Sequence, residues 1–172
     1  LRRLNIACGI AHKPEIIIFD EPTVAVDPQS RNNILEGIKK LNENGATIIY
    51  TSHYMDEVEE LCDDIVIIDR GKVIAKGSSE SLKNIIDINE KVSFVSENLD
   101  ESVIKKIKSI ETLVNFESKD NFYHLSFGHG KDNLIKLISI LNDNSVAYDS
   151  LTSQSPSLND VFLSLTGKEL RD

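Results

Sequence analysis

The sequence predicts an α/β chain in two parts, and three observations support this prediction. Short apolar runs alternate with amphipathic helical patterns over residues 1–79, which is typical of β-α-β units around a parallel sheet. A break rich in small residues follows at residues 77–81, with the sequence Gly-Ser-Ser-Glu-Ser. Beyond it, the periodicity predicts the order β-α-β-β-α-β and a closing helix. We therefore expect one domain over residues 1–79 and a second over residues 80–172.

The first part is predicted to alternate helices and strands. The run Ile16–Phe19 is apolar throughout and rich in β-branched residues, so we expect a strand buried on both faces. Asp27 is a favourable N-cap and Pro28 suits the first position of the following helix. The other expected elements are a helix over 1–12, a helix ending at Asn44-Gly45, a strand at 46–50, a short helix at 55–62 that is strongly acidic on its polar face, and strands at 65–68 and 73–75.

The second part has a different pattern from the first. Residues 83–90 are expected to form a helix or a linker. Strands are then expected at 92–94, 113–116, 122–127 and 146–152, with helices around 103–110 and 134–141. This is the ferredoxin-like order, so we predict an α+β domain of that type. Ser157 and Asp160 form a capping-box pattern at the start of a closing helix that Gly167 ends.

Composition narrows the range of partners. The 172 residues carry 28 acidic against 19 basic side chains, a formal net charge of −9. A chain this acidic, without a basic stripe, argues against nucleic acid as the main partner, because phosphate contacts need clustered Lys and Arg. No apolar run approaches the roughly 18–20 residues that span a bilayer. The two cysteines, Cys8 and Cys62, fit no disulfide or metal pattern, and we expect buried free thiols on helix faces in a reducing cytosol.

Charged and polar residues follow two of the predicted strands directly. Asp20 and Glu21 end the first strand, and Thr51-Ser52-His53 ends the second. An isolated Asp-Glu pair would most simply mark where a strand reaches solvent. Here Asp27 and Pro28 begin the connecting helix, and the carboxyl ends of neighbouring parallel strands form the edge where open α/β sheets bind ligands. The combination therefore indicates a ligand site at that edge.

These groups resemble the Walker B, D-loop and H-loop motifs of the ATP-binding cassette (ABC) ATPases. The segment 157–170, Ser-Leu-Asn-Asp-Val-Phe-Leu-Ser-Leu-Thr-Gly-Lys-Glu-Leu, resembles the C-terminal extension of drug-exporter-type (daunorubicin-resistance-like) ATP-binding subunits of bacteria. The resemblance covers nearly the whole chain. It implies the C-terminal half of a P-loop NTPase core followed by the ferredoxin-like domain. Ala25 and Val26 depart from the commoner Gly-Leu before the D-loop aspartate.

The resemblance also implies roles for four residues, with ATP and Mg²⁺ as cofactors. Asp20, at the Walker B position, would hold Mg²⁺, which prefers oxygen ligands and keeps several waters. Glu21 would polarise the attacking water. His53 would contact the terminal phosphate and help to hold Glu21. Asp27, in the D-loop, would lie at the interface between two nucleotide-binding domains.

Several motifs of the family have no counterpart in these residues. A P-loop needs G-x-x-x-x-G-K-[ST], and no Gly-Lys pair here (Gly71-Lys72, Gly130-Lys131, Gly167-Lys168) is followed by Ser or Thr. The glutamine loop and the signature loop have no match either, and the first residue is Leu1. We therefore expect a fragment of a longer protein that is inactive on its own.

The predicted function is that of the ATP-hydrolysing subunit of a bacterial ABC export system. In the complete protein the subunit would pair with a second copy and power a separate membrane permease. It would be cytoplasmic, held at the inner face of the membrane through that permease. The alternatives are a non-catalytic interaction or dimerisation module derived from an ABC ATPase, and a DNA-associated ATPase of the same class. A third alternative, an ABC translation factor, would need a second cassette, and none follows in these residues.

Overall fold

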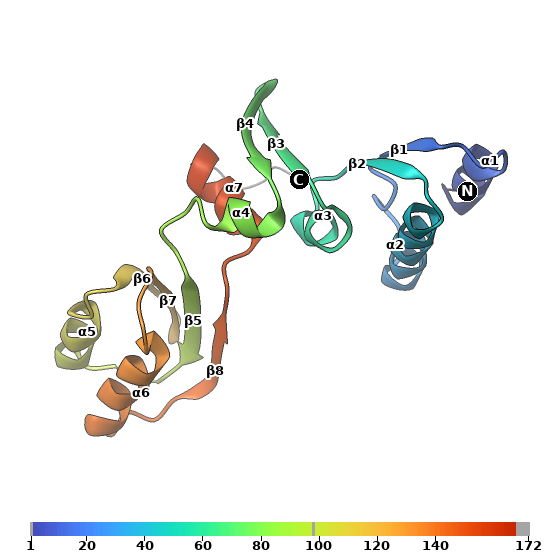
Figure 1. The fold of residues 1–172 in the computed structure, drawn as a ribbon. Helices are drawn as coiled ribbons and strands as arrows, with labels where there is room; N and C mark the ends of the chain where they lie inside the picture. Colours follow the sequence, from blue (N-terminus) through green and yellow to red (C-terminus); the bar gives the residue numbers. More distant parts are fainter. Residues whose placement is uncertain (1, 98, 168–172) are drawn as a thin grey trace. The chain divides into compact units, whose positions relative to one another are not determined.

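The computed structural model describes residues 2–97 and 99–167, which form two compact units (Figure 1). One unit contains the residues up to Ser79 together with Thr166 and Gly167. The other is Glu80–Leu165. The chain is thus a mixed α/β protein, as predicted. Both cysteines are free thiols, but Cys8 is exposed and Cys62 is half-buried, so the prediction of buried thiols is wrong for Cys8.

The first unit alternates helices and strands in the predicted order. Its elements are α1 (Arg2–Ile10), β1 (Ile16–Asp20), α2 (Pro28–Glu43), β2 (Thr47–Thr51), α3 (Met55–Leu61), β3 (Ile65–Asp69) and β4 (Lys72–Gly77). Strands β1 and β2 are parallel, with Ile16 opposite Thr47 and Asp20 opposite Thr51. Strands β3 and β4 form a separate antiparallel pair. Because β1 and β2 run in the same direction, both end at one edge of their sheet.

Helix α2 packs on the β1–β2 sheet through an apolar cluster. Ile17 and Phe19 of β1 are buried against Ile34 and Ile38 of α2. The alternate residues of β1 are different, since Ile16 is 63% exposed and Ile18 is 68% exposed. The prediction of a strand buried on both faces is therefore wrong for the described residues. Successive side chains of a strand point to opposite faces, and here only one face is covered.

The predicted break at residues 77–81 is partly helical. Helix α4 (Ser79–Lys83) begins within it, and its Leu82 is fully buried. A single buried leucine can anchor such a short helix although the surrounding residues are small and polar.

The second unit contains a four-stranded antiparallel sheet. Its elements after α4 are β5 (Glu90–Val95), α5 (Glu101–Lys108), β6 (Leu113–Lys119), β7 (Phe122–Phe127), α6 (Asn133–Asp143), β8 (Asp149–Gln154) and α7 (Leu158–Thr166). The strand order is β6-β7-β5-β8. Both α5 and α6 lie on one side of this sheet (Figure 1). The element order β-α-β-β-α-β is the predicted one.

The last strand of this sheet starts later than predicted. Residues from Val146 were expected to extend, but β8 begins at Asp149. The Val146 amide donates to the carbonyl of Leu141 at 2.9 Å, so this residue closes the end of α6 instead of pairing in the sheet. Val146 still packs against the core of the unit.

Helix α7 begins with the predicted capping box. The Ser157 amide donates to Asp160 Oδ2 at 2.8 Å, and the Asp160 amide donates to Ser157 Oγ at 3.3 Å. Lys91 Nζ of β5 adds an ion pair to Asp160 Oδ1 at 2.6 Å. Burial alone raises the pKa of Asp160, but the hydrogen bonds from Lys91 and Ser157 lower it more, so the pKa lies below the usual 3.8.

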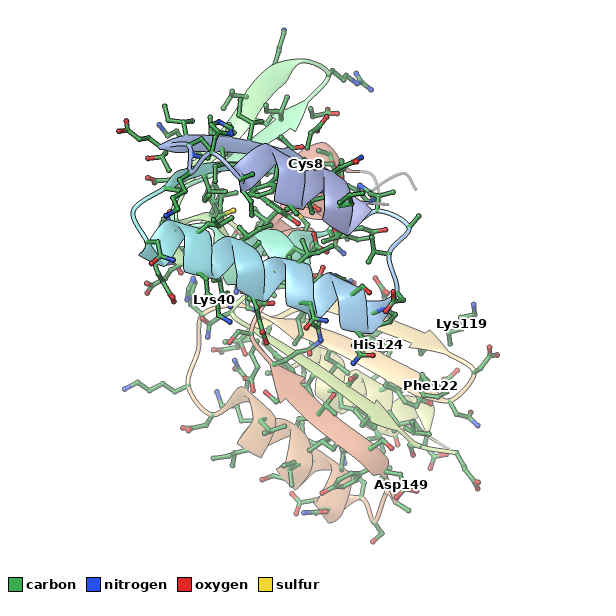
Figure 2. All side chains as sticks on the ribbon, turned by 90° about the vertical axis from the view of Figure 1, so that its right-hand side faces the viewer. Cys8, Lys40, Lys119, Phe122, His124 and Asp149 are labelled. Atoms are coloured by element: carbon green, nitrogen blue, oxygen red, sulfur yellow. The ribbon has the colours of Figure 1, made fainter. Side chains whose placement is uncertain are left out.

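We expect Asp160→Asn to destabilise the second unit in a pH-dependent way. A carboxyl whose pKa is lower in the folded state adds stability above its unfolded pKa, and this contribution is lost as the pH falls through the folded value. The loss should be about 1 kcal/mol at neutral pH and should shrink in strong acid. Urea unfolding followed by amide resonances of the unit measures it. Asp149→Asn, at an exposed position of β8 (Figure 2), is the control, and an equal loss at pH 7 and in strong acid would contradict the assignment.

Candidate functional site

The carboxyl ends of β1 and β2 are joined beyond the last strand pair. The Glu21 amide donates to the carbonyl of Thr51 at 3.1 Å, just after Asp20 and Thr51 face each other in the sheet. Glu21 has a φ of +46°, a left-handed conformation that residues with a Cβ seldom adopt. The chain therefore turns sharply at Glu21 and remains beside the end of β2.

Glu21 and His53 contact each other directly. His53 Nδ1 lies 3.0 Å from Glu21 Oε1, and both side chains are 36% exposed. A carboxylate oxygen accepts, so Nδ1 carries the hydrogen in this contact. The His53 ring also lies beside the ring of Tyr54, with centroids 4.2 Å apart. Two residues that are 32 positions apart in the sequence thus form one acid–imidazole pair at the sheet edge.

Asp20 is placed on the same edge and is exposed to solvent. Thr51 Oγ1 donates to Asp20 Oδ1 at 2.6 Å, which orients the carboxylate. Within the residues that the structure describes, no three His, Cys, Asp or Glu side chains gather as a metal cluster. The residues present fit an Mg²⁺ ion held through the single carboxylate of Asp20, with water and phosphate oxygens as its other ligands.

Asp27 lies at the start of α2 and acts as its N-cap. Its Oδ1 accepts from the Ser30 amide at 2.9 Å, and Pro28 occupies the first helical turn. The backbone hydrogen bond from Ser30 is the main reason that the pKa of Asp27 is lowered. The predicted capping role is confirmed, and its role between two nucleotide-binding domains stays a prediction.

The structure also shows a residue that the sequence analysis missed. Glu57 of α3 is fully buried, and its Oε2 accepts from Thr23 at 2.9 Å, from Tyr50 at 2.5 Å and from Ser52 at 3.1 Å. Burial, and then the hydrogen bond to Glu57, raise the pKa of the Tyr50 phenol. Glu57 was missed in the sequence analysis because it lies in a helix whose acidic residues were expected on the polar face. Its helical spacing could have indicated burial, because Glu57 lies four residues before Leu61 and therefore on the same inner face of α3.

Comparison with known proteins finds several relatives that are ATP-binding proteins of resistance or export. No family model matches the chain. It is 41% identical over 99% of its length to the linearmycin resistance ATP-binding protein LnrL of Bacillus subtilis, of which it covers 56%. It is 30% identical over 99% of its length to the daunorubicin/doxorubicin resistance ATP-binding protein DrrA of Streptomyces peucetius, of which it covers 52%. A Nod factor export ATP-binding protein of Cupriavidus metallidurans is 31% identical over 99% of the chain and is covered to 54%.

Among solved structures, an ATP-binding subunit of an ABC transporter is 31% identical, with a TM-score of 0.44 over 46% of this chain and 33% of that one. The chain spans about half the length of the curated relatives it matches. Its homologues are ABC transporter ATP-binding proteins, including those of drug resistance and Nod factor export.

Proposed function

We propose that this chain carries the water-activating part of the ATP-binding subunit of a bacterial ABC export system. The observation that supports this most directly is the contact between His53 Nδ1 and Glu21 Oε1 at 3.0 Å, at the carboxyl edge of a parallel strand pair. The names of the relatives describe ATP-binding proteins of resistance and export. They give no support to a DNA-associated or a non-catalytic role.

In this proposal, Glu21 accepts the proton of the attacking water and His53 holds Glu21 in place. A general base must lie within hydrogen-bond reach of the water that it activates. The Glu21 side chain as a whole is 36% exposed, whereas its Oε2 atom is buried. The Nδ1–H of His53 donates to one carboxylate oxygen, which restricts rotation of the carboxyl group. Asp20 would hold Mg²⁺, which when bound neutralises negative charge on phosphate oxygens.

The nucleotide phosphates would be held by a P-loop from polypeptide outside these 172 residues. Within the described residues, β2 pairs only with β1 and β3 only with β4. A groove of about 660 Å³ lies between them, lined by β2 and by Val66 and Ile68 of β3. Ile49, Val66 and Ile68 are 49%, 46% and 59% exposed. A further strand in this groove would pair with the open edge of β2 and bury these side chains.

The 172-residue chain alone is therefore expected to hydrolyse no ATP above background. Backbone N–H groups and a lysine of a P-loop are needed to offset the charge of the phosphates, and Asp20 and Glu21 by themselves repel it. Phosphate release at saturating ATP and Mg²⁺ measures this, with a longer protein that includes a P-loop as the positive control. Turnover by the 172 residues would contradict the need for a P-loop, and an inactive longer protein would contradict the ATPase assignment.

The second part, residues 80–172, is proposed to be a ferredoxin-like accessory domain, and residues 1–79 a partial nucleotide-binding domain. The strand order β6-β7-β5-β8 with two helices on one face supports the fold assignment. No helix in the described ranges is long and apolar enough to cross a bilayer. The complete subunit would act as a pair of copies on a separate permease at the inner face of the membrane. Loss of pairing on deletion of residues 157–172 would support a role of this domain in that assembly.

A further inference from the structure

We propose that Glu57 is a positioning residue that holds the loops carrying Glu21 and His53 at a fixed separation. The inference rests on the function proposed for that pair. The carboxylate of Glu57, on α3, is completely buried and is bound by Thr23, Tyr50, Ser52 and Arg31. A buried carboxylate is stable only when donors surround it, and each of its donors comes from a segment next to the site.

The first link runs to the loop after β1. Thr23 lies two residues beyond Glu21, is only 2% exposed, and donates its hydroxyl to Glu57 Oε2 at 2.9 Å. The Val24 amide in turn donates to the carbonyl of Glu21 at 3.4 Å. The segment that turns away from β1 is thus tied to Glu57 directly after the proposed base.

The second link holds His53 from both sides. Ser52 Oγ donates to Glu57 Oε2 at 3.1 Å and accepts from the Tyr54 amide at 3.0 Å. The Glu57 amide donates back to the carbonyl of Tyr54 at 3.1 Å. The residues before and after His53 are therefore both connected to Glu57, which limits where the imidazole can lie.

The third link is made by Arg31 of α2. Its Nε lies 2.6 Å from Glu57 Oε1, and the guanidinium lies over the Tyr54 ring at 5.1 Å from the centroid. Tyr54 also contacts the His53 ring, as described above. One carboxylate thus receives hydroxyls from the loop after β1 and from β2 and its loop, and an arginine from α2. This arrangement can hold the loop after β1 and the loop after β2 at a fixed separation.

The test uses imidazole ¹⁵N resonances of the 172-residue chain, with His12, His124 and His129 as internal references. Glu21→Ala defines the His53 Nδ1 resonance when the contact is lost. In Thr23→Val, Ser52→Ala and Glu57→Gln, this resonance should move toward the Glu21→Ala value. Glu60→Gln is the matched control: it makes the same chemical change on α3 but removes only the exposed ion pair of Glu60 with Lys39. It should leave the resonance in place.

The proposal is overturned if the three variants keep wild-type amide spectra and an unmoved His53 resonance. It is also overturned if all three fail to fold, because the cluster would then be a general requirement of the core. In a longer subunit with a P-loop, Thr23→Val should lower kcat about tenfold with little change in KM, as expected of a misplaced base. If the resonance moves but the unmodified subunit shows no turnover, the proposed function fails while the positioning role stands.

Discussion

In the complete subunit, Glu21→Gln is expected to keep ATP binding and to lower kcat by about a hundredfold to ten-thousandfold. The amide side chain has nearly the shape of the carboxylate and its oxygen can still accept from His53 Nδ1, but it cannot take a proton from water. Asp20 and its hydrogen bond from Thr51 are left intact, so binding of Mg²⁺ and nucleotide should be retained. Single-turnover phosphate release, combined with equilibrium binding of a fluorescent nucleotide, separates the two effects.

Glu15→Gln provides the matched control for this experiment. Glu15 is exposed at the opposite end of β1, just before its first residue Ile16, and should leave kcat unchanged. His53→Ala is expected to reduce turnover as well, since it removes the donor that holds Glu21. Loss of nucleotide binding in Glu21→Gln, or full activity in both variants, would contradict the assigned roles.

Phe94→Ala should destabilise the second unit by about 3–5 kcal/mol, because a large buried side chain is replaced by a cavity. Phe94 of β5 is 1% exposed and stacks on Tyr123 of β7 with ring centroids 5.1 Å apart. It lies in the cluster with Ile107 of α5 and Leu137 of α6, so both helices would lose contacts. The free energy of unfolding, measured in urea from amide resonances of this unit, gives the size of the effect.

Phe122→Ala is the control for the core prediction. Phe122 is also a phenylalanine of this sheet but is 53% exposed on β7 (Figure 2), so its loss should cost less than about 1 kcal/mol. Equal losses of unfolding free energy for the two substitutions would contradict this prediction. They would mean that the face of the sheet opposite α5 and α6 is covered.

Local patterns were sufficient to predict the order of the elements. Apolar periodicity located both helix–strand alternations, and Asp27, Pro28 and Ser157 marked helix starts that the hydrogen bonds to Ser30 and Asp160 bear out. The proximity of Glu21 and His53 was also predictable. Two consecutive β-branched strands joined by one helix pair in parallel, which brings the residues after each strand to one edge.

Burial could not be predicted in the same way. Glu57 has the composition of a surface residue, yet it is fully buried among three hydroxyls and an arginine from other segments. Ile16 and Ile18 have the composition of core residues, yet more than half of each side chain is exposed. In both cases the outcome depends on which neighbours pack against the side chain, and those neighbours lie far away in the sequence.

The sequence by itself determined the elements, their order and the pair of strand ends that carry Asp20, Glu21 and His53, because propensity, capping and alternation act over a few residues. Only the tertiary structure decided which faces are covered and that Glu57 connects the two loops. Those features depend on side chains that come together when distant segments pack, and on polar groups that must find partners once they leave water.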